Sequence, residues 1–492
     1  MGKLGIAVAT SETAGSAGVS IQTGTAFILG LTDSGPSTPQ LIGSEAAYVS
    51  LYGERTATSS VSFDAVSTFF NLNGARCYFL RVGKEASGKR AEPAAQLKAA
   101  AHAEAIKVVA KYVGTLGNKL QVEVKESGAE YEVVILNAAS EVLETTGLLK
   151  EAKQLIGLTS PYVIYEEGTK YAEGKTEKLE KLAAKKLEGG VNPSATITEA
   201  LVKEALELLP KTLGPGQVLI PATAGEPVEE KVHILMGEHS LKTNRVALCD
   251  IADSAVTATL IGNKKTYAAG IAGYMAFFSS SCVIAGVTLG TTRTIPASVI
   301  AAGLCAQVAK TENDNQAPAG VQWTGAGQGL AGVVTGFTNT FSKTNMELLA
   351  ENGINPFAER QTKLVLYDFV SALPRTTDKI FCQFSASRER MHLVWAAEEV
   401  AEGFLFLPID GRKQLFSAFQ NALQAMLLRQ YNLKALFGET AQEAFLVNLA
   451  EPVNTLTTQS EGQLNAELRV RLSPYAEAIN LTIVSSSVAE PV

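Results

Sequence analysis

Cysteine and histidine are scarce in this chain, whose 492 residues include five cysteines and four histidines. The cysteines are odd in number, widely spaced and mostly set in apolar stretches. That pattern is typical of small buried hydrophobic side chains rather than of disulfides or zinc ligands. Among the histidines, His233 and His239 are six positions apart and would not share one face of a helix. These residues therefore predict no metal site.

Positive charge and long apolar runs are also lacking. Lysine and arginine number 42 against 49 acidic residues, giving a net charge of −7. General binding to DNA or RNA is therefore not expected, because it requires a basic surface. The nearest approach to a transmembrane run, residues 267–287, is interrupted by polar residues, and MGKLGIAVATSETAG at the N-terminus lacks the apolar segment of a secretion signal. We expect a soluble protein made in a cytoplasm, with no nucleic-acid partner and no membrane insertion.

The motifs of common enzymes are missing as well. No nucleophile elbow, zinc-protease, phosphate-loop or kinase motif occurs. Gly327, Gly329 and Gly332 match the spacing of a dinucleotide-binding loop, but that loop follows a hydrophobic strand and opens a helix. Here PAGVQWT precedes the glycines, so they predict an ordinary loop. The sequence predicts no catalytic residue and no cofactor.

What the chain does contain is the composition of a folded protein of several domains. It is 46% hydrophobic and 18% charged, and its length exceeds what one hydrophobic core usually supports. A strand at 25–31, helices at 44–52 and 61–71, and a strand at 75–82 indicate an α/β layer. Strand–helix units with continuous apolar strands follow between 191 and 339 and predict a doubly wound, mostly parallel sheet. The predicted fold class is α/β, mixed α+β, with several domains.

Local signals predict further elements in the second half of the chain. Thr196 and Glu199 have capping-box spacing and predict the start of a helix. The segments 362–369 and 379–384 predict two strands, with a long helix after them. The clearest helix is 413–432, whose apolar side chains form one stripe.

The C-terminal region carries two alternating patterns of the kind that half-buried strands show. In LNAELRVRL the apolar face consists of Leu464, Ala466, Leu468, Val470 and Leu472. In AINLTIVSSS, residues 478–487, apolar and polar side chains also alternate. The two segments could form a ribbon through Ser473 and Pro474. A two-stranded ribbon leaves unpaired backbone groups along its edges, so a further partner is needed.

An enzymatic alternative depends on two carboxylates. Asp250 and Asp253 follow a predicted strand of the middle domain, at the edge where ligands of doubly wound folds usually bind. Without partner motifs, helix caps or turns are the simpler interpretation. A ligand-binding or hydrolytic enzyme that uses these residues is the alternative function.

Several stretches, taken in order, resemble the contractile tail sheath proteins of phage tails, tailocins and related contractile injection systems. The C-terminal ones are SASRERMHLVWAAEE, FLFLPIDGRKQLFSAFQNALQAMLLRQYN and LNAELRVRLSPYAEAINLTI. The others are GVSIQTGTAFILGLTDSGPSTPQ, KYVGTLGNKLQVEV, KLEGGVN and DNQAPAG. Together they span nearly the whole chain. Residues 140–186 match no sheath segment, and Ala17-Gly18-Val19 stands where many sheaths have a proline–glycine pair.

The resemblance implies a structural subunit rather than an enzyme. Such subunits form stacked rings, hexameric in the family, within a helical sheath around an inner tail tube. A baseplate and a tail terminator are further partners. Contraction drives the tube through the envelope of the target cell and, in a phage, leads to genome ejection. The particle would be a virion or a virion-like contractile system assembled in the host cytoplasm.

The resemblance also implies that chain ends link the subunits by adding strands to a neighbour's ribbon. The N-terminal arm strand would consist of Gly18, Val19, Ser20, Ile21 and Gln22. The C-terminal arm strand would contain Ile479, Leu481, Ile483 and Val484. The receiving ribbon would include the apolar face of residues 464–472. Candidates for contact with the tube are the basic residues Arg412, Lys413, Arg429 and Lys434.

Six segments follow from these patterns and from the resemblance. They are an N-terminal arm (1–22), the first part of the inner sheath core (23–84), a β-rich outer insertion (85–190), a doubly wound α/β domain (191–339), a C-terminal inner core facing the tube (340–478) and a C-terminal arm (479–492).

Overall fold

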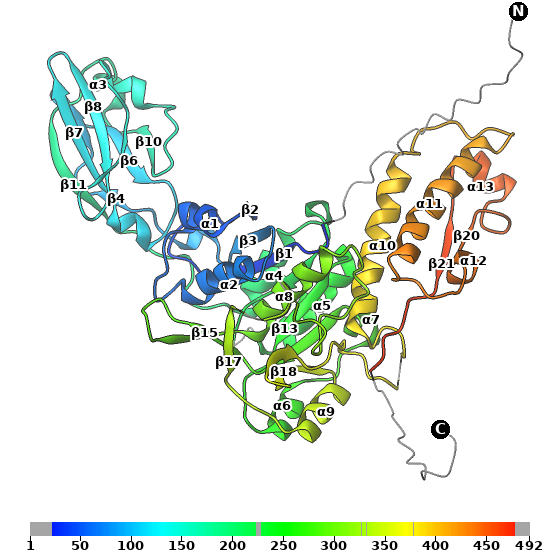
Figure 1. Cartoon of the computed structure of the whole chain (residues 1–492). Coiled ribbons are helices and arrows are strands. Elements are labelled where there is room, and N and C mark those ends of the chain that lie inside the picture. The colour runs from blue at the N-terminus through cyan, green and yellow to red at the C-terminus, as the bar shows by residue number, and fades with distance from the viewer. Residues whose placement is uncertain (1–21, 223–227, 326, 331, 377, 478–492) are drawn as a thin grey trace, which may run out of the picture.

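The structure is a computed structural model that describes residues 22–222, 228–325, 327–330, 332–376 and 378–477. Figure 1 shows a central α/β body, a β-rich module that projects from one side, and a group of helices and strands on the other side. Of the two predicted arm strands, all residues except Gln22 lie outside the described part. The pairing of both arms therefore stays a prediction.

An eight-stranded sheet forms the centre of the molecule (Figure 1). Its order is β19-β18-β14-β13-β12-β1-β3-β2, and neighbours are parallel except at the two edges, where β2 and β19 run antiparallel to the strand beside them. Every residue of β1, β13 and β14 is buried, as expected of parallel strands covered on both faces. The strands are β1 (Ala26–Gly30), β2 (Gln40–Ile42), β3 (Cys77–Arg81), β12 (Gln217–Leu219), β13 (Val246–Asp250), β14 (Met275–Ser279), β18 (Ile354–Arg360) and β19 (Lys363–Leu366).

The predicted doubly wound sheet is therefore confirmed, but it is larger than the segment 191–339. Strands β1 to β3 come from residues 23–84, and β18 and β19 come from beyond residue 340. These segments share one sheet because β1 pairs with β3 on one side and with β12 on the other. The six domain boundaries themselves stay a prediction.

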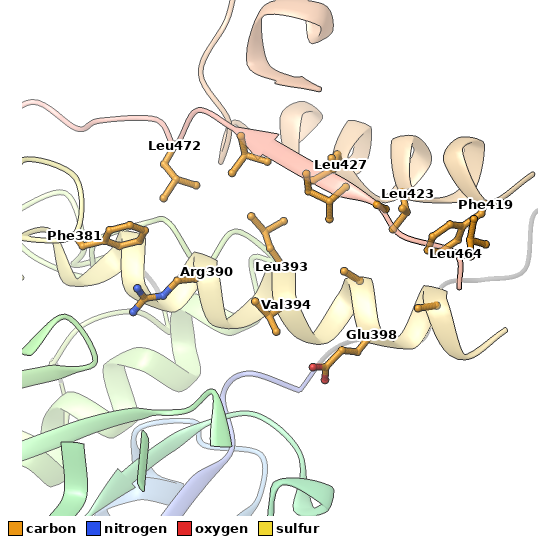
Figure 2. Close-up of a pocket in the computed structure, with 15 residues that line it drawn as sticks. Phe381, Arg390, Leu393, Val394, Glu398, Phe419, Leu423, Leu427, Leu464 and Leu472 are labelled. Carbon is orange, nitrogen blue, oxygen red and sulfur yellow. The ribbon is translucent and has the colours of Figure 1, made fainter. Parts of the chain in front are cut away.

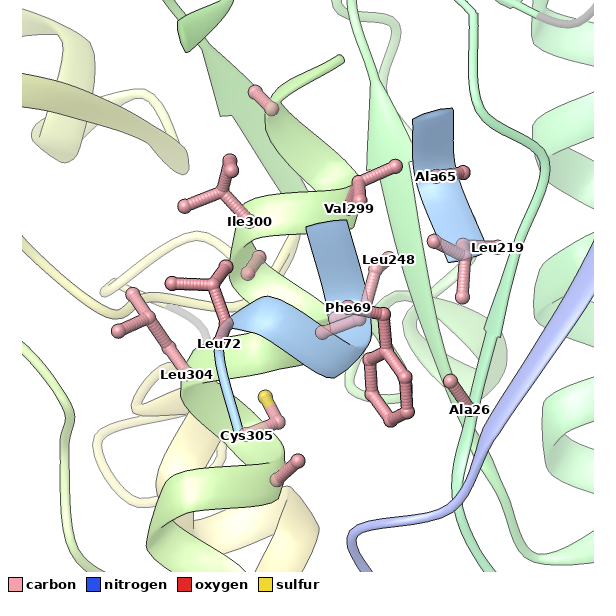
Figure 3. Packing of buried hydrophobic residues seen from close by; sticks show 14 of the residues in the cluster. Ala26, Ala65, Phe69, Leu72, Leu219, Leu248, Val299, Ile300, Leu304 and Cys305 are labelled. Carbon is pink, nitrogen blue, oxygen red and sulfur yellow. The ribbon is translucent and has the colours of Figure 1, made fainter. Parts of the chain in front are cut away.

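Helices cover both faces of this sheet. On one face, α2 (Ser60–Asn71) packs against α8 (Ala297–Ala309), and on the other lie α4 (Glu199–Glu207) and α5 (Glu230–Thr243). Figure 3 shows Leu72, the residue directly after α2, beside Leu304 of α8. A Cβ atom on Gly303 would lie 2.5 Å from the Cβ of Leu72, so the close approach of α8 to this side chain requires glycine.

Shorter elements complete the central body. Helix α1 begins after Ser44, whose hydroxyl accepts a hydrogen bond from the Ala47 amide at 3.1 Å. The remaining elements are α1 (Glu45–Tyr52), α6 (Thr257–Asn263), α7 (Ala269–Ala272), α9 (Lys343–Glu351) and a small sheet of β15 (Cys282–Ala285), β16 (Thr292–Ile295) and β17 (Val334–Phe337). Gly327, Gly329 and Gly332 all have positive φ and lead into β17 rather than into a helix, as the loop prediction requires.

The projecting module is β-rich, as predicted, and has its own hydrophobic core. One sheet has the order β10-β6-β5 and the other the order β4-β11-β7-β8-β9. Residues 140–186, which resemble no sheath segment, supply β9, β10 and most of β11. The module contains β4 (Glu92–Pro93), β5 (Leu97–Ala99), β6 (His102–Ala110), β7 (Gln121–Ser127), β8 (Glu130–Leu136), β9 (Val142–Thr145), β10 (Val163–Glu167), α3 (Tyr171–Gly174) and β11 (Leu182–Glu188).

Residues 384–472, here called the C-terminal unit, form the third part. Two long helices lie side by side with a two-stranded ribbon, and the predicted apolar stripe of 413–432 forms their shared core with Phe416, Phe419, Leu423 and Leu427 buried. The unit consists of α10 (Phe384–Glu402), α11 (Gln414–Asn432), α12 (Ala441–Ala444), β20 (Phe445–Asn448), α13 (Leu456–Ser460) and β21 (Glu467–Val470).

Two local predictions are wrong. Residues 379–384 form turns that lead into α10, because Phe384 is the first residue of that helix and packs edge-on against Phe369. Helix α4 is capped by Thr198 rather than by Thr196, since it is the Thr198 hydroxyl that accepts a hydrogen bond from the Leu201 amide.

Candidate functional site

The ribbon of the C-terminal unit has an open edge. Strand β21 pairs antiparallel with β20, from Phe445 opposite Val470 to Asn448 opposite Glu467, and no further strand joins this sheet within the described residues. From the sequence, 464–472 could pair with the segment that follows it, residues 478–487. In the structure, the strand beside β21 is β20. The opposite side of β21 is therefore available for another strand.

Hydrogen bonds at the end of β21 identify which residues face this open edge. The N–H of Arg471 donates to Ala444 O at 2.9 Å, and the carbonyl of Arg471 accepts from Phe437 N at 2.8 Å, so both groups point toward the β20 side. Because successive residues of a strand direct their backbone groups to opposite edges, those of Leu468, Val470 and Leu472 point away from β20. This edge presents donors and acceptors in the alternating order that an added antiparallel or parallel strand requires.

An apolar groove of about 470 Å³ runs along β21 (Figure 2). Its walls are β21 on one side and α10 on the other, with side chains of α11 beneath, and no residue of β20 lines it. The five residues of the predicted apolar face all line this groove, and Leu464, Leu468, Val470 and Leu472 are only half-buried. From the helices, Leu393, Val394 and Phe419 contribute, with Arg390 and Glu398 as the charged residues of the lining. The apolar face of the ribbon is thus incompletely covered by the residues that the structure describes.

The groove has the length of an extended peptide. The segment 464–472, which contains β21, would span about 26 Å at the rise of a strand. A segment with alternating apolar side chains, laid against the open edge of β21, would direct every second side chain into the groove. The site is therefore suited to bind a strand rather than a compact ligand.

The four basic residues predicted for tube contact do not form one cluster. Arg412 and Lys413 precede α11, while Arg429 and Lys434 lie at its other end, about 25 Å away at the rise of a helix. All four are exposed, and Arg429 forms an ion pair with Glu312. Contact with a tube stays a prediction for each of them.

The carboxylates of the enzymatic alternative are engaged in structural hydrogen bonds. Asp250 is buried and accepts from the Ser298 amide and hydroxyl at 2.7 Å each and from the Ala222 amide at 3.1 Å, so it holds the start of α8. Burial raises the pKa of Asp250 to about 6. Asp253 accepts from Asn339 at 2.7 Å and from Thr338 at 2.5 Å. Neither residue is a helix N-cap, because Pro296 is the N-cap residue of α8 and Val256 is that of α6. Both carboxylates instead bond to residues distant in the chain.

The cysteines and histidines also have structural surroundings. All five cysteines are unpaired and buried. His233 is buried against Tyr267 and the carbonyl of Asp250, and burial lowers its pKa to about 4. Within the described ranges, no three metal-binding side chains come together, and no helix is both long and apolar enough to span a bilayer.

A buried cluster of polar residues, which the sequence did not predict, lies in the first half of α10 and the loop beside it. Asp314 is fully buried and binds Arg388 at 2.6 Å and His392 at 2.9 Å. The neighbouring Asn315 amide donates to Glu389 at 3.1 Å. We call Asp314, Asn315, Arg388, Glu389 and His392 the α10 polar cluster. Arg388 and His392 are four residues apart and so share one helical face, which was the only local signal in the sequence.

The charges of the α10 polar cluster perturb one another. Burial raises the pKa of Asp314, but the charge of Arg388 and the hydrogen bond to His392 lower it more, so the net shift is downward. Burial lowers the pKa of His392, and the contact with Asp314 more than reverses this effect. Burial raises the pKa of Glu389 to about 7. The cluster thus contains an ionised carboxylate and a carboxyl that titrates near neutrality.

Comparison with solved structures gives the fold a class. The chain is similar to the sheath tail protein of Listeria innocua, with a TM-score of 0.63 and 14% identity over 87% of this chain and 89% of that one. It is also similar to the sheath tail protein of Desulfitobacterium hafniense, with a TM-score of 0.59 and 13% identity over 91% of this chain and 93% of that one.

An injection system provides a third likeness. The helical sheath of the anti-feeding prophage in its contracted state matches with a TM-score of 0.54 and 14% identity, over 99% of this chain and 100% of that one. No family model and no curated protein matches the sequence. The protein therefore has the fold of contractile tail sheath proteins, as the resemblance implied, and the likeness extends over nearly its whole length.

Proposed function

We propose that this chain is a structural subunit of a contractile sheath. It polymerises into stacked rings, six subunits to a ring, that wind around an inner tail tube, and contraction drives this tube through the envelope of a target cell. The proposal rests on one observation, the open edge of β21 beside an uncovered apolar groove, in a chain with the fold of sheath proteins. A baseplate and a tail terminator would bound the sheath, in a virion or virion-like particle assembled in the host cytoplasm.

The links between subunits would be the two chain ends. The N-terminal arm strand, residues 18–22, and the C-terminal arm strand, residues 479–485, have the alternating pattern that a strand added to β21 needs. An apolar side chain at every second position would enter the groove, while backbone groups would pair with Leu468, Val470 and Leu472. Arms from neighbouring copies would thus complete the ribbon.

Energetics favours a cooperative polymer over isolated dimers. A strand that pairs with these three residues forms about six main-chain hydrogen bonds, each worth about 1 kcal/mol net. Two or three buried aliphatic side chains add about 1.5–3 kcal/mol each. Ordering seven residues costs about 1–2 kcal/mol per residue, so the two sides nearly balance for one arm. On a preformed ring, several arms together bind a subunit stably. Once the first arm is bound, the other contacts are intramolecular and form at a high effective concentration.

The same arrangement allows contraction without breaking the lattice. The central sheet has a continuous buried core and would move as a rigid body, while the arms keep neighbours connected as subunits rotate and slide. New contacts between rigid cores would supply the driving free energy, so no nucleotide is required.

The test is negative-stain electron microscopy of the concentrated full-length protein. We expect rings or long hollow tubes, and deletion of residues 1–22 should abolish long polymers while leaving a folded monomer. Ile21→Asp should have the same effect because it places a charge on the predicted apolar face of the arm. Ser20→Asp, on the other face, is the matched control and should assemble. Normal tubes from the deleted protein would contradict the proposal.

A ligand screen separates this function from the enzymatic alternative. An enzyme that uses Asp250 or Asp253 would be stabilised by its ligand, so its melting temperature would rise with ligand concentration. Both carboxylates already hold backbone and side-chain donors, which supports a structural role for them.

A further inference from the structure

The two ends of the described chain are attached to neighbouring residues. The hydroxyl of Thr23, one residue after the predicted N-terminal arm, donates to Asp314 at 2.6 Å. The side-chain amide of Asn315 donates to the carbonyl of Ser473, shortly before the C-terminal arm, at 2.7 Å. Residues 23 and 473 are thus 450 positions apart in the sequence and are linked through two consecutive residues of the loop after α8.

Both attachment points are fixed to one helix. Asp314 binds Arg388 and His392 of α10, and the Asn315 amide donates to Glu389 of the same helix. Asn315 also donates to the carbonyl of Ala435, after α11, at 3.1 Å. The loop therefore connects the central body, both long helices of the C-terminal unit and both chain ends.

The attachment at Thr23 is buried, and the attachment at Ser473 is partly buried. Thr23, Asp314 and Asn315 are all almost inaccessible to solvent. Burying the charges of Asp314 and Arg388 costs solvation free energy, and apolar side chains of equal volume would often stabilise the fold equally well. The polar groups instead provide geometric specificity, because a hydrogen bond holds its donor and acceptor at a defined distance and angle.

We use the term arm root for the residues where each arm joins the folded chain, around Thr23 for the N-terminal arm and around Ser473 for the C-terminal arm. We propose that Asp314 and Asn315 are positioning residues that anchor both arm roots, so that displacement of one arm root is transmitted to the other through this loop. The inference rests on the proposed function, in which the chain ends link subunits. A pull on the N-terminal arm of a subunit would then reach its C-terminal arm through two adjacent residues and α10, in addition to loading the central sheet, where Gln217 of β12 donates to the Thr23 carbonyl at 2.7 Å. Each subunit would carry tension along the chain of linked neighbours.

If the two attachments are independent, weakening one of them should lower local stability only around that attachment. If they share an anchor, weakening one of them should lower local stability at both arm roots. Hydrogen exchange of the full-length protein distinguishes the two, with peptides covering residues 22–30 and 471–477. The Thr25 amide, bonded to Gln22 O, reports on the first root, and the Ser473 amide, bonded to Ala435 O, reports on the second.

The variant is Thr23→Val, which removes the hydroxyl and keeps the shape. We expect exchange to become about fivefold faster in both peptides, as the loss of one hydrogen bond would produce. Thr68→Val in α2 is the matched control, because the Thr68 hydroxyl is buried and has no hydrogen-bond partner among the described residues. This control should leave both peptides unchanged.

Faster exchange in 22–30 alone would overturn the proposal, as would no change in either peptide. Asn315→Leu gives the reciprocal test and should accelerate exchange in 22–30 as well as in 471–477. Measurement at protein concentrations below those of assembly keeps the result independent of polymer formation. A chain that forms no tubes would contradict the proposed function, whereas uncoupled exchange would contradict the anchor alone.

Discussion

The central sheet and the ribbon of the C-terminal unit differ in how completely their apolar faces are buried and their strand edges are paired. In the sheet, the four central strands β1, β12, β13 and β14 are completely buried, and the two edge strands have only three and four residues. In the ribbon, β21 leaves one edge unpaired and its apolar face half-exposed. Among the described residues, the sheet buries its interior strands, whereas the ribbon leaves an apolar face partly uncovered. If the proposed function is correct, stability and assembly depend on different parts of the molecule.

The largest expected effect on stability lies in the central body. Phe69→Ala should lower the free energy of unfolding by about 3–5 kcal/mol, because the ring of this α2 residue is completely buried in the core beneath the helix. Phe406→Ala is the matched control. Phe406 is fully exposed in the loop after α10, so this substitution should change stability by less than about 0.5 kcal/mol. Urea unfolding measures both, and equal losses would break the comparison.

The open edge can be tested with proline, which has no N–H to donate. Val470→Pro removes a donor that faces away from β20, so the pairing with β20 should persist while assembly is lost. Arg469→Pro removes a donor that faces β20 and should destabilise the ribbon itself. Electron microscopy and circular dichroism of the two variants check this. Assembly by Val470→Pro would show that no strand adds at this edge.

The α10 polar cluster predicts a dependence of stability on pH. The pKa of Glu389 is raised to about 7 in the folded state, above its ordinary value of 4.5. Stability from this group is therefore fully present below pH 4.5 and is lost as pH rises through 7. The neighbouring charges are Asp314, Arg388 and His392. The raised pKa of His392 acts in the same direction, while the lowered pKa of Asp314 matters only at pH values below its ordinary value of 3.8.

Glu389→Gln isolates this effect because glutamine does not titrate. From pH 5 to pH 8, the native protein should lose on the order of 1–3 kcal/mol of stability relative to the variant. Fluorescence of Trp395, which lies on α10 one turn beyond His392, can follow urea unfolding at each pH. Parallel pH profiles for the two proteins would contradict the assignment.

The smallest effect is expected at the surface. Arg429 and Glu312 form an ion pair whose side chains are both nearly half-exposed. Arg429→Ala should lower the free energy of unfolding by less than about 1 kcal/mol, and less still at high salt. If Arg429 contacts a tube, the same variant should bind an inner tail tube more weakly than the native protein in a cosedimentation assay, although its stability is nearly unchanged.

Local patterns in the sequence determined much of what is seen. Alternation of apolar residues in 464–472 identified one face of β21, and every residue of that face lines the groove. The apolar stripe of 413–432 identified α11 and its buried side. Continuous apolar strands identified the parallel sheet. Each of these follows from the repeat of a strand or a helix, which neighbouring residues define by themselves.

Only the tertiary structure decided which elements meet. The place of β1 between β3 and β12, the pairing of β21 with β20, and the contact of Thr23 with Asp314 join residues distant in the chain. The end of the predicted strand at 379–384 became the start of a helix because Phe384 packs on Phe369. The pattern of apolar side chains shows which face of an element is buried. It does not show which other element covers that face, since many apolar surfaces could do so. That choice depends on packing and hydrogen bonding across the whole molecule.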